Sequence, residues 1–325
     1  MKANILIWLF SIANIYAMAQ FPPPAGVEGT TAIHMDSSAF INWAKSCTIE
    51  RGYLDISHPE IGFVDYGSED DGILKADLSV VSLGDGGTAV LTFDPPIING
   101  DGFDFAVFEN SFSDDFLELA LVYISSDGID YDLFPAFSYS PTETQIAPFG
   151  TIDATKIHNL AGKYRMAYGT PFDISDIEDA LGKVIPQISH IKLVDVIGSI
   201  DEQYATYDSE GNIINDPWPT AFPSGGFDLD AIGVIHQLTD IDKIPYLQKQ
   251  ITVYPNPNSG HFYIKNKSAI TSLAYEIRNI QGQIVKKGMS CQQIETISLE
   301  LKQGVYSITF IAEGFSINKR FIVCY

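Results

Sequence analysis

From about Leu78 onward, the sequence consists of short β-forming runs separated by Gly, Pro, Asn and Asp. Runs of this length with turn residues between them are typical of a β-sandwich or jelly roll, and not of alternating strands and helices. We therefore predict that the body of the protein is mainly β, with a jelly-roll-like sandwich. The predicted strands of the body are 88–93, 103–109, 117–125, 191–196 and 225–235.

One or two short helices are expected beside these strands. Asp36 is a possible N-cap for residues 37–45, where Phe40 and Trp43 would share a buried face. Ser175, with Glu178 three residues later, forms a capping-box pattern ahead of an apolar run. Both segments are interpreted as packing elements.

The charge of the 325-residue chain is unevenly distributed. Residues 1–250 hold 11 Lys and Arg against 37 Asp and Glu, whereas residues 251–325 hold 8 against 4. This contrast predicts a domain boundary. The proposed division is a signal peptide at 1–19, an acidic β-sandwich body at 20–238, a linker at 239–250 and a C-terminal domain at 251–325. The acidic body would repel nucleic acid and anionic lipid, so neither is expected as a partner, and it favours cations.

The N-terminus has the pattern of a secretion signal. Met1 and Lys2 are followed by an apolar run and then by Ala17-Met18-Ala19, a small-x-small cleavage site. The apolar run is shorter than the ~20 residues of a spanning helix, and no other segment is apolar for long enough to cross a bilayer. We therefore predict Sec-dependent export, cleavage after Ala19 and no transmembrane segment.

The C-terminal 75 residues read as five to seven short strands joined by Pro, Asn and Gly turns. They contain YPNPNSG at 254–260, a Gly-turn hairpin at 280–285, LKQGVYSI at 301–308 and KRFIV at 319–323. This region resembles the C-terminal sorting domain of type IX secretion substrates, which implies a small immunoglobulin-like β-sandwich. Gln281 departs from the acidic or Asn residue that is common in that hairpin, but the Gly turn is kept.

The resemblance implies a destination for the protein. Such a tail is recognised by the type IX secretion machinery after Sec export, and the protein then crosses the outer membrane. The product is secreted or attached to the cell surface, usually with loss of the tail. The tail itself would carry no chemistry.

The body resembles a family of uncharacterised exported bacterial cell-surface proteins. The likeness rests on three segments, NGDGFDFAVFEN at 99–110, GTPFD at 169–173 and GGFDLDAIG at 225–233. It implies no activity that could be transferred to this chain.

The same segments contain candidate metal ligands. In residues 227–230 two aspartates alternate with two apolar residues, so a strand would place both carboxylates on one face, where they repel each other unless a cation or a shared proton intervenes. Ca²⁺ fits such a set because it takes six to eight oxygen ligands. The alternative is that these acids are solvated strand edges or turn residues. The candidate ligands are Asp228, Asp230, Asp104, Glu109 and Asn110.

The proline-rich segment 215–224 is a candidate ligand-binding loop. Trp218 and Phe222 could stack on a carbohydrate or another planar ligand, because aromatic rings present flat apolar faces. Alternatively, Trp218 closes one end of the sandwich.

No catalytic motif was identified: the chain has no Gly-x-Ser-x-Gly elbow, no His-Glu-x-x-His helix and no phosphate-binding Gly loop followed by Lys. The leading hypothesis is a non-enzymatic module, stabilised by Ca²⁺, that binds a carbohydrate or nutrient. The alternatives are a glycan hydrolase with paired carboxylates and an adhesive or structural surface protein.

Three cysteines, Cys47, Cys291 and Cys324, are interpreted as structural. In an exported chain, Cys291 and Cys324 could form a disulfide bond because both lie in the tail.

Overall fold

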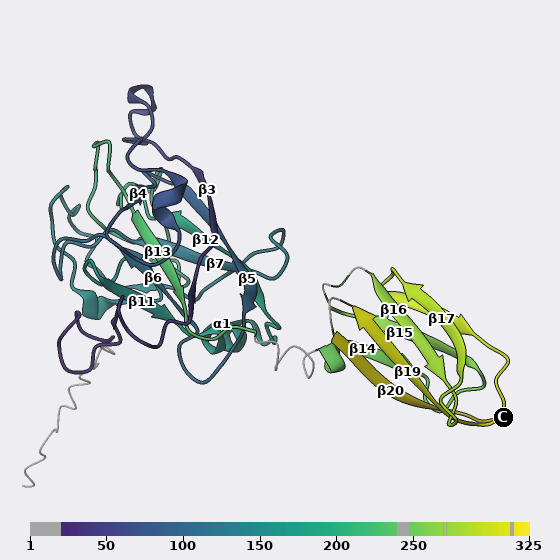
Figure 1. The fold of residues 1–325 in the computed structure, drawn as a ribbon. Helices are drawn as coiled ribbons and strands as arrows, with labels where there is room; N and C mark the ends of the chain where they lie inside the picture. The colour runs from purple at the N-terminus through teal and green to yellow at the C-terminus, as the bar shows by residue number, and fades with distance from the viewer. Residues whose placement is uncertain (1–20, 239–246, 269, 271, 313–314) are drawn as a thin grey trace, which may run out of the picture. The chain divides into compact units, whose positions relative to one another are not determined.

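The computed structural model describes residues 21–238, 247–268, 270, 272–312 and 315–325. The predicted signal peptide and residues 239–246 of the predicted linker lie outside them. The chain divides into two compact units between Gln237 and Leu238, and the first unit is the acidic body (Figure 1).

One sheet of the body is assembled from strands that are far apart in the sequence. These strands are β1 (Ile33–His34), β2 (Asn42–Trp43), β4 (Val81–Ser82), β6 (Phe105–Glu109), β11 (Tyr168–Phe172) and β13 (Asp228–Val234). Their order is β1–β11–β6–β13–β2, and β4 also pairs with β13. All pairs are antiparallel. β13 therefore lies inside the sheet, with neighbours on both edges.

The second sheet has the order β3–β5–β12–β7–β8 and is also antiparallel. Its strands are β3 (Ser46–Glu50), β5 (Thr88–Ile97), β7 (Ala120–Ser125), β8 (Asp132–Leu133) and β12 (Ile188–Asp195). A separate short ladder pairs β9 (Phe137–Ser138) with β10 (Ile157–His158).

The main core of the body draws on both sheets. Val107 and Leu229 come from the first sheet, and Leu91, Val122 and Leu193 come from the second; all are buried in one cluster. Burying apolar side chains from two sheets is what stabilises a sandwich. The predicted mainly β sandwich is confirmed.

The predicted helix near residue 175 is present as α1 (Ile174–Leu181), and its N-cap is Asp173, whose Oδ1 accepts a hydrogen bond from the Ser175 amide at 2.9 Å. The helix ends at Gly182, whose positive φ of 62° suits glycine. The described residues also contain the short 3₁₀ helices η1 (Pro59–Ile61), η2 (Glu69–Gly72) and η3 (Ala154–Lys156).

The predicted helix at 37–45 is wrong. Residues 42–43 instead form β2, which pairs with β13. Phe40 and Trp43 lie against Phe108, with ring centroids 5.5 Å from it in each case. The two rings therefore cover the outer face of the first sheet, and this packing together with strand pairing outweighs the local helical pattern.

The second unit contains two antiparallel sheets in its described residues. One is β14 (Ile251–Tyr254), β15 (His261–Asn266) and β18 (Ile294–Ser298), in that order. The other has the order β17–β16–β19–β20, with β16 (Leu273–Arg278), β17 (Ile284–Ser290), β19 (Gly304–Ala312) and β20 (Phe315–Val323). Phe262, Ile277, Ile308 and Phe321 meet in a core of their own. The predicted small C-terminal β domain is confirmed.

The suggested disulfide bond is absent. All three cysteines belong to the described part of the chain and are free thiols, with Cys291 and Cys324 exposed. Cys47 is buried, and burial raises the pKa of its thiol to about 12. A thiol with such a pKa stays protonated and unreactive, in agreement with a structural role.

Candidate functional site

Asp104 holds three chain segments together. Its Oδ1 accepts hydrogen bonds from the Gly100 amide at 2.7 Å and from His236 Nδ1 at 2.8 Å, and its Oδ2 accepts one from the Ile174 amide at 2.8 Å. Both oxygens are thus already engaged where β6 begins, β13 ends and α1 starts. This is the environment of a structural carboxylate.

Asp230 has a similar structural role at a different place. Its two oxygens accept hydrogen bonds from the amides of Asp77 and Leu78 at 3.1 and 3.2 Å. Leu78 has a φ of 73°, in the left-handed region that a leucine seldom adopts, so these bonds fix an unfavourable backbone conformation. Burial raises the pKa of Asp230 to about 6.

Glu109 and Asp228 lie near each other because Glu109 is opposite Leu229 in the β6–β13 pair. Ser111 donates its amide to Glu109 Oε2 at 2.7 Å, and the Ser82 hydroxyl donates to Asp228 Oδ1. Asp228 and Asp230 are only 9% and 2% exposed. The alternative that these two aspartates are solvated strand edges is therefore wrong, since β13 is covered on both faces.

The five predicted metal ligands do not form one group. Asp104 and Glu109 occupy opposite ends of β6, about 16 Å apart at the rise of a strand. Asn110 is half-buried next to Glu109. Within the described residues, no three His, Cys, Asp or Glu side chains are arranged so that they could hold a metal ion. Of the five, Glu109 and Asp228 lie within electrostatic reach of each other, and Asn110 follows Glu109 in the chain.

Three further buried acids, which the sequence reasoning missed, lie within electrostatic reach of Glu109, of Asp228 or of one another: Glu118, Asp195 and Asp216. Together with Glu109 and Asp228 they form what we call the acid cluster. Each missed residue follows an apolar residue or an amide in the sequence, as in Leu117-Glu118-Leu119 and Val194-Asp195-Val196. For Glu118 and Asp195, a single acid inside an apolar run was the available signal, whereas Asp216 stands between Asn215 and Pro217 and had no such signal.

Four members of the acid cluster have hydrogen-bond donors. Asp195 accepts from the amides of Phe227 at 2.7 Å and Gly86 at 3.0 Å, and Asp216 Oδ2 accepts from the Leu119 amide at 2.8 Å. Glu118 is the exception, because none of the hydrogen bonds of the described residues involves its carboxylate.

The pKa values of the acid cluster are raised chiefly by burial. Burial, followed by the charges of neighbouring carboxylates, raises the pKa of Glu118 and Glu109 well above the ordinary value. Burial also raises the pKa of Asp195 and Asp216 well above normal and that of Asp228 to about 6. Over the described ranges, no Lys, Arg or His forms an ion pair with a member of the cluster.

Trp218 lies beside the acid cluster, on the loop that follows Asp216. Its indole Nε1 donates to Asp85 Oδ2 at 3.0 Å, and its amide donates to the Ile146 carbonyl at 3.0 Å. The ring is half-buried. Trp218 thus connects the loop to the rest of the body, as expected for a residue that closes the end of the sandwich.

Phe222 belongs to a series of four phenylalanines. The rings of Phe112, Phe116, Phe149 and Phe222 contact one another in this order, with centroid separations of 5.8, 6.2 and 5.5 Å. Phe112, Phe149 and Phe222 are 69%, 74% and 39% exposed. We call this surface feature the phenylalanine row. It comes from three separate loops, and only Phe222 was singled out from the sequence.

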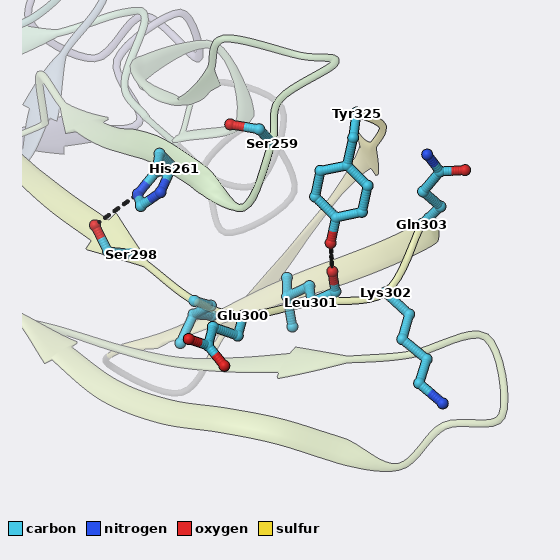
Figure 2. A pocket seen from close by; sticks show the side chains of 9 residues that line it. Ser259, His261, Ser298, Glu300, Leu301, Lys302, Gln303 and Tyr325 are labelled. Carbon is cyan, nitrogen blue, oxygen red and sulfur yellow. Dashed lines mark hydrogen bonds between the residues drawn. The ribbon is translucent and has the colours of Figure 1, made fainter.

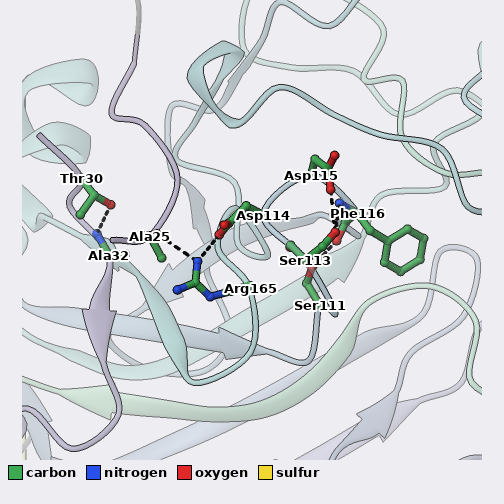
Figure 3. A network of polar contacts seen from close by, with 9 residues as sticks. All are labelled: Ala25, Thr30, Ala32, Ser111, Ser113, Asp114, Asp115, Phe116 and Arg165. Carbon is green, nitrogen blue, oxygen red and sulfur yellow. Dashed lines mark hydrogen bonds and ion pairs between the residues drawn. The ribbon is translucent and has the colours of Figure 1, made fainter. Parts of the chain in front are cut away.

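A polar network fixes the loop that carries the first two rings of the row (Figure 3). The Ser111 hydroxyl donates to the carbonyls of Ser113 and Phe116, and the Ser113 hydroxyl donates to Asp115 at 2.6 Å. Arg165 pairs with Asp114 and donates to the Ala25 carbonyl at 3.0 Å. The exposed rings are therefore held on a well-supported loop.

The second unit has a surface hollow of about 770 Å³ (Figure 2). Its lining includes His261, which contacts the Ser298 hydroxyl through Nδ1 at 3.0 Å, and Tyr325, whose hydroxyl donates to the Leu301 carbonyl. The lining residues Glu300, Lys302 and Gln303 are exposed, so the hollow is an open part of the surface and not an enclosed binding site.

Solved structures show only weak similarity to the chain. PorZ, a bacterial surface component of the type IX secretion system of Porphyromonas gingivalis, is 17% identical over 30% of this chain and 14% of its own, with a TM-score of 0.23. A β-glucuronidase from Ruminococcus gnavus is 9% identical over 87% of this chain and 45% of its own, with a TM-score of 0.21. The BSP domain of a biofilm-associated protein is 12% identical over 89% and 52%, with a TM-score of 0.21. At such TM-scores, none of these likenesses implies an activity or a ligand. Among curated proteins, none matches this sequence.

The tail gives a definite family match. Residues 252–324 match the secretion system C-terminal sorting domain family. In the described residues, no helix has the length and apolar character needed to span a membrane. Residues 252–324 therefore form a sorting domain of the type IX secretion system, which makes the chain a secreted or cell-surface protein.

Proposed function

We propose that the body is a non-enzymatic carbohydrate-binding module and that the sorting domain delivers it through the type IX machinery, after Sec-dependent export, to the cell surface or the medium. The phenylalanine row is the observation that carries this proposal. Exposing three large aromatic rings side by side has a free-energy cost in water, and such patches mark interaction sites.

A carbohydrate suits the row because the apolar face of a sugar ring can stack on an aromatic ring. Four rings in succession would contact several sugar units, which favours a polysaccharide over a single sugar. Asp114 and Asp115 lie in the same loop as Phe112 and Phe116 and are accessible enough to accept hydrogen bonds from sugar hydroxyls. The loops of a β-sandwich are a usual place for such sites.

The proposal predicts that Phe112→Ala combined with Phe149→Ala weakens polysaccharide binding about tenfold. Each lost stacking contact costs roughly 0.5–1.5 kcal/mol, and about 1.4 kcal/mol corresponds to a factor of ten in affinity. Affinity electrophoresis of the protein from Gln20 onward, in gels containing β-glucan, xylan or mannan, would measure the effect.

Ile129→Ala is the matched control. Ile129 is 81% exposed and follows the C-terminal end of β7, whereas Phe112 and Phe116 precede the N-terminal end of that strand. Its loss should therefore leave binding unchanged. If the wild-type protein migrates equally fast in gels with and without each polysaccharide, the proposed binding module is refuted. Release of reducing ends would support the hydrolase alternative, and concentration-dependent self-association in sedimentation would support the adhesive alternative.

A further inference from the structure

We propose that the binding surface continues from Phe222 to Tyr66 and that its ligand is a long, uncharged polysaccharide. This inference rests on the proposed carbohydrate-binding function and specifies the class of polysaccharide. Phe222 is the last ring of the phenylalanine row, and Tyr66 lies in the loop of residues 64–68 that leads into η2. The two residues are far apart in the sequence, so their proximity is a property of the fold.

The two segments are joined at Pro223, the residue after Phe222. The Pro223 carbonyl accepts hydrogen bonds from the amides of Asp65 and Tyr66 at 3.3 and 3.2 Å. Phe222 is 39% exposed and Tyr66 is 52% exposed, and Pro223 between them is exposed as well. The exposed apolar surface of the row therefore extends from Phe222 over Pro223 to Tyr66.

Arg51 holds the backbone of the Tyr66 loop in place. Its Nη1 donates to the carbonyls of Tyr66 at 2.7 Å and Ser82 at 2.5 Å, and its Nη2 donates to the Gly67 carbonyl at 2.6 Å. The Ser82 amide donates in turn to the Tyr66 carbonyl at 3.2 Å. None of the ion pairs of the described residues involves Arg51, so its guanidinium serves to fix main-chain carbonyls.

Gly67 lets the Tyr66 loop lie directly against the segment that enters β4. Its φ is 71°, and a Cβ at this position would lie 2.1 Å from the Val80 carbonyl oxygen, so only glycine fits. The backbone beside Tyr66 is thus fixed from two sides. A ring on a preorganised loop loses little conformational entropy on binding, and more of its contact energy appears as affinity.

The Tyr66 loop also offers polar groups for sugar hydroxyls. The side chains of Asp65 and Tyr66 are both exposed, and neither forms a hydrogen bond or an ion pair through its side chain within the described chain. The phenol can donate and accept, and the carboxylate can accept. Trp218, by contrast, already uses its single donor for Asp85. An apolar ring with a free hydroxyl suits a sugar, which has an apolar face and a hydroxyl rim.

The charge around this surface favours neutral sugars. The exposed Asp65 lies at the Tyr66 end, and the exposed Asp115 lies beside Phe116 near the other end. Residues 1–250 hold 37 Asp and Glu against 11 Lys and Arg, so the field of the whole body is negative. Polymers of uronic acids or sulfated sugars would be repelled, whereas polymers of uncharged sugars would not.

The test is calorimetric titration of the protein from Gln20 onward with cello-, xylo- and manno-oligosaccharides of increasing length. In the wild type, affinity should rise with length until the ligand covers both the row and Tyr66. In Tyr66→Ala, the affinity for the longest oligosaccharides should fall about three- to tenfold. The affinity for disaccharides should stay unchanged, because they fit on the row alone. Tyr66→Phe keeps the ring and should lose less. A merely structural role of Tyr66 would weaken the binding of short and long ligands alike.

Tyr263→Ala is the matched control, because Tyr263 is a 41% exposed tyrosine of the second unit, and its loss should leave binding unchanged. If affinity depends on ligand length in the same way in Tyr66→Ala and in the wild type, the extension to Tyr66 is overturned while the phenylalanine row remains the binding site. If the wild type binds none of the oligosaccharides or polysaccharides, both proposals are overturned.

The preference for an uncharged ligand is tested by carboxymethylation of the β-glucan, xylan or mannan that the wild type binds. In affinity gels, the carboxymethylated polymer should retard the protein less than the unmodified one. The difference should shrink as salt is added, because salt screens the repulsion between carboxylates. Equal retardation by both polymers at low salt would overturn the restriction to uncharged polysaccharides.

Discussion

Replacement of Asp104 by alanine is expected to lower the free energy of unfolding by about 2–5 kcal/mol. The amides of Gly100 and Ile174 and the ring of His236 would lose their common acceptor. Each buried donor left unsatisfied costs roughly 1–3 kcal/mol. Urea unfolding followed by circular dichroism at pH 7 measures the change.

Asp101→Ala is the matched control for this substitution. Asp101 is exposed, three residues earlier, and makes no side-chain hydrogen bond in the described part of the protein, so its loss should change stability by less than ~0.5 kcal/mol. The cost of Asp104→Ala should be the same in calcium and in EDTA. A cost that appears only in calcium would instead make Asp104 an ion ligand, as first expected from the sequence.

In EDTA, the free energy of unfolding is expected to rise when the pH falls from 7.5 to 5. Burial raises the pKa of Asp85, Asp228 and Asp230 from 3.8 to about 6. A group whose pKa is raised in the folded state binds its proton more tightly there. Its contribution is therefore fully present below pH 3.8 and is lost as the pH rises through about 6.

For each of these three aspartates, the gain between pH 7.5 and 5 is about 1 kcal/mol. Glu109, Glu118, Asp195 and Asp216 act in the same direction. His158 and Lys163 act in the opposite direction, because burial lowers the pKa of His158 below 6.5 and that of Lys163 to about 7. The carboxylates with lowered pKa, such as Asp55 and Asp153, lose their contribution below this pH window.

Denaturant midpoints measured at both pH values would test the pH dependence. Asp85→Asn should reduce the rise by about 1 kcal/mol, since the amide has no proton to bind. A free energy of unfolding that stays constant or falls as the pH is lowered from 7.5 to 5 would contradict the raised pKa values of the buried acids.

The strands were predictable because their signal is local. The runs 88–93, 103–109 and 191–196 correspond to β5, β6 and β12, and turn residues set their limits. The helix at 37–45 failed because Phe40 and Trp43 pack on Phe108, which lies some 65 residues away in sequence and is therefore invisible to a local pattern.

The candidate site was only partly predictable for the same reason. Asp228 could be recognised from its alternation with apolar residues, but Glu118 and Asp216 reach it from other loops. Phe222 was identified through its proline-rich loop, whereas Phe112 and Phe149 became relevant only when the fold brought their rings together. The spacing of apolar residues predicts on which face of a strand a side chain lies. Only the tertiary structure shows which residues from other segments lie beside it.

The loops that carry the phenylalanine row keep the exposed rings apart from the contacts that support the fold. Asn215 holds the neighbouring loop by donating to the carbonyls of Pro141 and Thr144 at 2.7 and 2.9 Å, so the support is separate from the exposed rings. Phe112 and Phe149 contribute nothing to the buried core clusters. Substitutions at these two positions should therefore leave the stability of the scaffold unchanged, so under the proposed binding function the surface chemistry can be altered without loss of the fold.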